Sequence, residues 1–219
     1  MDLKGAEMMA RLDQGMVLNV AKEMLASGDF SLDALRNRVG NPSTRTLYRT
    51  LEKWQRELGE DDVGKPNARR IFHDYLLYRA SVDLCGLCFD VQRTSSGAHS
   101  LLVELIRRIV GYLSSDLQLN NVIIRGTSSS GERKARVLTA HQKIFWNELR
   151  NIVRRAQDEC LAKEIDTDVL LRTIHGSIHE CIYGLSIRQF TGETYTVDNI
   201  VEGLELLLRQ LCRTPDQPH

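Results

Sequence analysis

The stretch Ser31-Leu-Asp-Ala-Leu-Arg-Asn-Arg-Val-Gly-Asn-Pro-Ser-Thr-Arg-Thr-Leu-Tyr-Arg-Thr-Leu-Glu-Lys-Trp54 predicts two short helices joined by a tight turn. Ser31 can accept hydrogen bonds from the free amides of a first helical turn. Gly40 can take the left-handed conformation that ends a helix, and the Asn-Pro that follows prevents its continuation. Ser43 or Thr44 then caps the second helix. This pattern predicts a helix-turn-helix, whose second helix enters the major groove of DNA.

The second helix has two chemically different faces. One face is apolar at helical spacing, with Leu47, Leu51, Trp54 and Leu58. The other carries the residues that we predict to contact DNA: Ser43, Thr44, Arg45, Thr46, Tyr48, Arg49 and Lys53. Residues 31–58 hold three more cations than anions, although the whole chain is neutral. The alternative interpretation is an ordinary helical hairpin with a solvated basic face.

Two family resemblances follow from these residues. The run from Gly40 to Trp54, Gly-Asn-Pro-Ser-Thr-Arg-Thr-Leu-Tyr and then Leu-Glu-Lys-Trp, resembles the DNA-binding segment of KfrA-type plasmid regulators over residues 16–58. The spacing of Ser31, Gly40 and Thr46-Leu-Tyr48 is similar to that of TetR-type regulators. The turn is one residue longer than the TetR pattern. The Phe-x-x-Lys break after the recognition helix is missing, so this helix is expected to be longer than in TetR-type relatives.

Composition favours an all-helical protein with a small head and a larger body. The chain has 219 residues, 42% of them apolar, 6% aromatic and only four prolines. Residues 59–66 hold two glycines, a proline and an acidic cluster, so we predict a DNA-binding domain at 1–60 and a body at 67–213. The absence of a signal sequence and of long apolar runs predicts a cytoplasmic protein without membrane spans. Five cysteines fit a reducing compartment.

Hydrophobic periodicity predicts the helices of the body. We expect helices over 67–93, 98–119, 132–163, 165–190 and 196–211, with an irregular loop at 122–131. Gly126 and Gly131 have the spacing of a phosphate-binding loop. Glu132 and Arg133 stand where that loop needs a lysine and a hydroxyl residue, so nucleotide hydrolysis is disfavoured.

The order of these last helices resembles the body of TetR-type regulators. The resemblance implies a homodimer built from the last two helices of each subunit, and a helical body that encloses an effector. The residues expected at the dimer interface are Gly176, Cys181, Gly184, Val201, Leu204 and Leu208. The alternative for the small residues among them is packing within their own subunit.

Two motifs that could carry chemistry are incomplete. Cys85 and Cys88 form a Cys-x-x-Cys in the middle of a predicted helix. Two thiols packed in the core or in a pocket wall are therefore favoured over a redox site, and redox activity stays open. His175 and His179 have the spacing of a metal-binding pair, but no third ligand is evident. No hydrolase motif is present. We therefore expect no catalytic residues, no metal, no cofactor and no enzymatic activity.

The segment 67–93 is apolar on several sides and carries polar tips, which is typical of a ligand-binding wall. The expected effector-pocket residues are His73, Tyr75, Tyr78, Cys85, Cys88, Phe89, Tyr112 and Trp146. The sequence therefore favours a TetR-like transcriptional repressor that binds a palindromic operator in double-stranded DNA and is released by an unknown small molecule. Two alternatives remain open. They are an effector-free plasmid- or nucleoid-associated DNA-binding protein and a helical ligand-binding or scaffold module.

Overall fold

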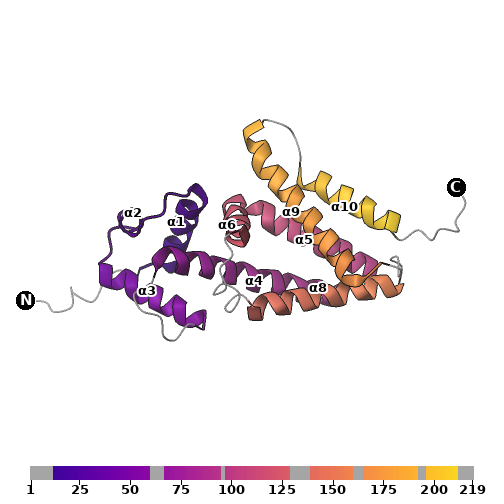
Figure 1. Ribbon diagram of the computed structural model, residues 1–219, viewed down its shortest axis with the longest axis horizontal. Coiled ribbons are helices and arrows are strands. Elements are labelled where there is room, and N and C mark those ends of the chain that lie inside the picture. Colours follow the sequence, from indigo (N-terminus) through magenta and orange to yellow (C-terminus); the bar gives the residue numbers. More distant parts are fainter. Residues whose placement is uncertain are drawn as a thin grey trace, which may run out of the picture. The chain divides into compact units, whose positions relative to one another are not determined.

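The computed structural model describes residues 12–59, 67–94, 97–128, 139–159, 165–191 and 196–211. Over these ranges all regular structure is helical (Figure 1). The chain divides into two compact units. The first contains residues 1–78 and 122–137, and the second contains residues 79–121 and 138–219.

The first unit begins with three helices, α1 (Gln14–Ser27), α2 (Leu32–Arg38) and α3 (Thr44–Glu57). Ser31 caps α2 as predicted, because its side chain accepts a hydrogen bond from the amide of Ala34 at 3.2 Å. The turn between α2 and α3 contains Gly40 at φ 86° and also Asn41 at φ 55°. Two consecutive left-handed residues reverse the chain there, and asparagine is one of the few side chains that tolerate this conformation.

The core of the first unit includes a group of stacked aromatic rings. Helix α4 (Ala68–Thr94) begins in this unit and ends in the second. Trp54 of α3 stacks on Tyr75 of α4 with ring centroids 4.7 Å apart, and meets Phe72 edge-on at 5.2 Å. Phe30 contacts the other side of this group, 5.5 Å from Phe72. Helix α3 is thereby fixed to the first turns of α4.

The second unit is a helical bundle around α5 (Ala98–Ser115). Helix α5 packs against α8 (Thr139–Glu159), α9 (Thr167–Thr191) and α10 (Val197–Leu211), and α8 also packs against α9. The buried faces are aliphatic, with Leu101, Leu105, Val110, Ile152, Ile182, Ile200 and Leu208 among the most covered side chains. Thr196 caps α10 by accepting from the amide of Asn199 at 3.2 Å, as predicted.

One expectation from the sequence is corrected. The loop expected from residue 122 is wrong for residues 122–128, because the chain turns at Asp116 and continues as helix α6 (Leu117–Ser128). Residues 129–131 lie outside the described residues, as do residues 60–66 of the predicted linker. The boundary between the two compact units falls inside α4 after residue 78, and the domains expected at 1–60 and 67–213 stay a prediction. The first eleven residues of this helix pack with the head, which a change in composition could not reveal.

Candidate DNA-binding and effector sites

The recognition helix presents its predicted DNA face to solvent. Ser43 is its N-cap, because its hydroxyl accepts from the amide of Thr46 at 3.1 Å and lies 2.8 Å from the hydroxyl of Thr46. Arg45 and Arg49 are exposed, whereas Leu47, Leu51 and Trp54 are buried on the opposite side. Thr44 and Lys53 are also exposed, and Tyr48 is half-buried. The helix continues without a break to Glu57, as predicted from the missing break motif.

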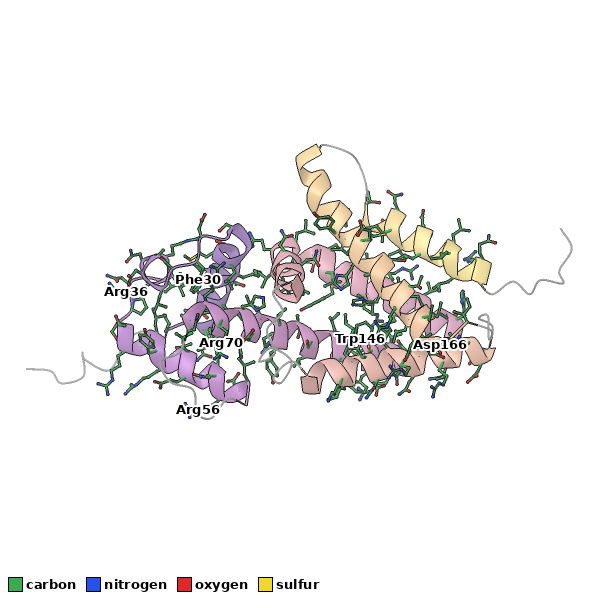
Figure 2. The ribbon with its side chains drawn as sticks, viewed as in Figure 1. Phe30, Arg36, Arg56, Arg70, Trp146 and Asp166 are labelled. Carbon is green, nitrogen blue, oxygen red and sulfur yellow. The ribbon has the colours of Figure 1, made fainter. Side chains whose placement is uncertain are left out.

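Arg36 of α2 holds the turn that precedes the recognition helix. Its Nε donates to Oδ1 of Asn41 at 2.9 Å, and its Nη1 donates to the hydroxyl of Thr44 at 3.2 Å. Figure 2 labels Arg36 on its helix. The backbone amide of Asn41 in turn donates to the carbonyl oxygen of Arg36 at 2.8 Å. One guanidinium therefore links α2, the left-handed residue of the turn and the first residue of α3.

A groove of about 760 Å³ lies beside the recognition helix, between the start of α1, the turn and α3. Lys53 donates to Oε1 of Gln14 at 3.1 Å across this groove, and its ammonium lies 3.6 Å from the carboxylate of Glu57. Arg49 also lines it. Gln14 and Asn41 were not expected at the DNA face. No spacing in the sequence links Gln14 to Lys53, since the two are 39 residues apart.

Three of the expected effector residues belong to the first unit. Tyr75 is buried, stacks on Trp54 and donates through its hydroxyl to Glu57 at 2.7 Å. The ring of Tyr78 lies 5.9 Å from that of Tyr75. His73 is half-buried, with Nδ1 3.2 Å from the carboxylate of Asp74. Tyr75 therefore supports helix α3, and its assignment to an effector pocket stays a prediction.

The other expected pocket residues of α4 and α5 lie in the second unit. Cys85 and Cys88 are both buried. Burial raises the pKa of both thiols, that of Cys88 to about 12, so neither is a reactive thiolate at neutral pH. Phe89 is 43% exposed. The hydroxyl of Tyr112 donates to Asp83 at 3.0 Å, and burial together with this carboxylate raises its pKa.

Trp146 and two histidines form an aromatic row between α8 and α9. The rings of Trp146 and His175 are 4.6 Å apart, and those of His175 and His179 are 4.3 Å apart. Burial lowers the pKa of both histidines, that of His175 to about 4, so both are neutral near pH 7. Trp146 and His175 also border an open pocket of about 450 Å³, together with Arg150 and Asp168, whose side chains are hydrogen-bonded at 2.7 Å.

The dimer interface stays a prediction, and its aliphatic residues are already covered within one chain. Val201, Leu204 and Leu208 are buried within their own chain, on a helix that packs against α5. Side chains that are already covered offer little surface to a second copy. The outer side of α10 instead exposes Leu206 and Leu207. The broad apolar stripe read from the sequence contains both sets, and only the packing against α5 separates them.

The small residues of α9 remain accessible. Gly176 is exposed, and Cys181 and Gly184 are half-buried. Beyond the backbone of its own helical turns and its chain neighbours, a side chain added at Gly176 or Gly184 would meet none of the described atoms within 4 Å. Their own subunit therefore does not require glycine at these two positions, which weakens the alternative of packing within one subunit.

Comparison with solved structures decides the fold. The fatty acid degradation regulator FadR from Bacillus halodurans has a TM-score of 0.68 at 14% identity, over 89% of this chain and 96% of that chain. FadR from Bacillus subtilis, solved in complex with stearoyl-CoA, has a TM-score of 0.64 at 14% identity, over 89% and 96% of the two chains. A TetR transcriptional regulator from Streptomyces coelicolor has a TM-score of 0.52 at 14% identity, over 91% and 98%.

This chain has the TetR-type regulator fold. The fold class predicted from the sequence is thereby confirmed. No family model and no curated protein matches the sequence. The KfrA-type resemblance of the head is not confirmed and stays a prediction. Among the described residues, no helix is long and apolar enough to cross a membrane. Within the same residues, no three histidine, cysteine or acidic side chains form a cluster that could hold a metal ion.

Proposed function

We propose that this chain is a DNA-binding transcriptional regulator, a repressor that a small-molecule effector releases from its operator. The observation that carries the proposal is the recognition helix, with Arg45 and Arg49 exposed one turn apart on a helix whose opposite face is buried. Arginine binds both guanine edges and phosphates through its several N–H groups. The TetR-type fold supports the same function, because it is shared with transcriptional regulators.

The test of DNA binding is selection of operator sequences from a random duplex pool with the full chain. Arg45→Ala and Arg49→Ala are then compared with Arg93→Ala, which removes an exposed cation from the end of α4. Loss of a bidentate base contact is expected to cost about 1–3 kcal/mol and to relax specificity at one position. The control is expected to bind like the parent. Equal binding by all three variants across salt concentrations would refute the assignment.

The aromatic contacts around Trp54 provide the proposed coupling between effector binding and the DNA-binding face. Trp54 and Tyr75 join the recognition helix to the start of α4, and α4 continues for sixteen residues into the second unit. A ligand that prefers one conformation of α4 therefore biases the recognition helix. Release requires only that the effector bind the two conformations with different affinity. A coupling free energy of about 1–3 kcal/mol would lower operator affinity roughly 5- to 150-fold.

A fatty acyl coenzyme A is the first effector to test, because the similar FadR from Bacillus subtilis was solved with stearoyl-CoA. The assay is titration of stearoyl-CoA into a complex of the full chain with fluorescent operator DNA. A decrease in anisotropy at micromolar ligand is the expected result. Stearate at the same concentration is the control for detergent-like effects. An unchanged complex up to the solubility limit of stearoyl-CoA would exclude this class of effector.

The regulator is proposed to act as a homodimer on a palindrome. A single helix-turn-helix buries only about 600–1,000 Å² on DNA, so two heads about 34 Å apart are expected to share one operator. The interface is proposed on α9, through Gly176 and Gly184, and on the exposed side of α10. Gly184→Phe is expected to yield monomers in sedimentation experiments. Gly184→Ala is the matched control, and it should raise the free energy of unfolding by about 0.5–1 kcal/mol.

A further inference from the structure

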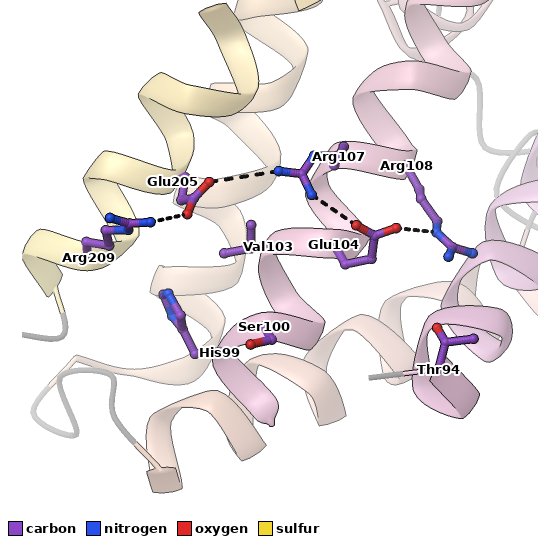
Figure 3. A pocket seen from close by; sticks show the side chains of 9 residues that line it. All are labelled: Thr94, His99, Ser100, Val103, Glu104, Arg107, Arg108, Glu205 and Arg209. Carbon is purple, nitrogen blue, oxygen red and sulfur yellow. Dashed lines mark hydrogen bonds and ion pairs between the residues drawn. The ribbon is translucent and has the colours of Figure 1, made fainter. Parts of the chain in front are cut away.

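A second groove lies within the second unit, and none of its lining residues belongs to α3. It has a volume of about 740 Å³. One side is a single face of α5 between His99 and Arg108, the other is formed by Glu205 and Arg209 of α10, and Thr94 at the end of α4 borders it (Figure 3). Volumes of about 300–1,000 Å³ are typical of sites for small organic ligands.

Five charged side chains of this groove form an alternating chain (Figure 3). Arg209 donates to Glu205 at 2.6 Å, and a second oxygen of Glu205 lies 4.0 Å from Nη2 of Arg107. Arg107 donates to one oxygen of Glu104 at 3.1 Å, and Arg108 donates to the other at 2.8 Å. Two carboxylates therefore orient three guanidinium groups, which leaves an excess of one positive charge.

The five charged side chains differ in how far solvent reaches them. The side chains of Glu205 and Glu104 are 24% and 31% exposed, whereas those of Arg108, Arg107 and Arg209 are 34%, 54% and 66% exposed. Arg107 and Arg209 are thus the most exposed of the five side chains, whereas Arg108 is covered about as much as Glu104. The hydrogen bond from Arg108 lowers the pKa of Glu104, so this carboxylate stays ionised and keeps both arginines in place.

The guanidinium groups retain donors for a ligand. Each carries five N–H bonds, and the contacts with the two glutamates engage only one or two of them per arginine. The start of α5 lies at the other end of the groove, where His99 and Ser100 line it. Its N-cap is Gly97, and no side chain caps this helix start. A helix start of this kind also favours negative charge.

We propose that the groove between α5 and α10 binds a phosphate-bearing small molecule. Arginines held in a fixed orientation bind phosphate oxygens through pairs of N–H bonds, and a groove of this volume accommodates an organic phosphate as well as an inorganic one. The site needs no DNA and no acyl chain. It is therefore separate from the proposed operator-binding helix, and pyrophosphate and ADP test it without the coenzyme A of the proposed effector.

The experiment is isothermal titration calorimetry of the full chain at constant ionic strength with three probes: inorganic pyrophosphate, ADP and coenzyme A. Arg107→Gln and Arg209→Gln remove one guanidinium each from the groove. Arg155→Gln is the matched control, because it removes an exposed arginine of α8 in the same unit. Saturable binding of at least one probe is expected, with a loss of about 10-fold or more in each groove variant and none in the control.

The probes distinguish the source of the phosphate. Binding of pyrophosphate as tightly as the organic probes would assign the site to inorganic phosphates, and binding of ADP or coenzyme A alone would assign it to organic phosphates. Two results would overturn the proposal: no saturable heat with any probe, or equal binding by the parent and both groove variants. In either case the charged chain only joins α5 to α10. Stability of the variants in urea, measured in parallel, separates lost binding from lost folding.

Discussion

Arg36 is expected to set the operator affinity without touching DNA. Its two side-chain hydrogen bonds fix Asn41 and Thr44, and so determine the angle at which the recognition helix leaves the turn. Arg36→Lys keeps the positive charge, but an ammonium cannot reproduce the planar fork that bonds both partners. Arg36→Ala removes the bonds and the charge together. The pair of variants therefore separates orientation from electrostatics.

The magnitude follows from the two bonds. A hydrogen bond contributes about 0.5–1.5 kcal/mol net, and both bonds here are exposed, so the lower part of that range applies to each. Loss of both is expected to cost about 1–2 kcal/mol in binding to the operator, which corresponds to roughly 5- to 30-fold in affinity. Affinity for unrelated DNA should not change in Arg36→Lys, because non-specific binding depends on charge.

The assay is fluorescence anisotropy with operator and scrambled duplexes from 50 to 300 mM salt. If Arg36 acts through the turn, the slope of log affinity against log salt is unchanged in both variants. If it binds a phosphate, the slope in Arg36→Ala falls by about one and both duplexes lose affinity equally. That outcome, or parent-like operator binding by Arg36→Lys, would refute the positioning role. Circular dichroism confirms that each variant keeps its helices.

Three further predictions concern the two units separately. Tyr75→Phe is expected to keep the stack on Trp54, so tryptophan emission should shift little to the red. Loss of the hydrogen bond to Glu57 should lower the free energy of unfolding by about 0.5–1.5 kcal/mol in urea titrations. The body is expected to lose stability as the pH falls from about 6.5 towards 4. In this range His175 binds a proton in the unfolded chain but stays neutral in the folded body, because burial lowers its pKa to about 4. His175→Phe should reduce this pH dependence, and an identical loss in the variant would exclude His175 as its source. Leu207→Asp is expected to give a folded monomer, whereas Leu208→Asp, at a buried position, should unfold the body, as sedimentation and circular dichroism would show.

The sequence predicted the helix-turn-helix almost residue by residue, because its signals are local. Capping by Ser31 and Ser43, the left-handed Gly40 and the alternation of faces in α3 each depend on residues within one or two turns. Hydrophobic periodicity gave α4 within a residue of its ends for the same reason. The TetR-type fold was predicted from the order of such elements.

Only the tertiary structure decided which faces of these helices are used. Val201 and Leu207 share one apolar stripe in the sequence, but packing against α5 buries the first and leaves the second exposed. Tyr75 is an aromatic residue with a polar tip, as many pocket residues are. In the structure it stacks on Trp54 and so supports helix α3. The ion pair between Arg107 and Glu205 joins residues almost a hundred positions apart. Local patterns determine where a helix begins and which sides are apolar, whereas the choice of partner for each side depends on contacts between residues distant in the chain.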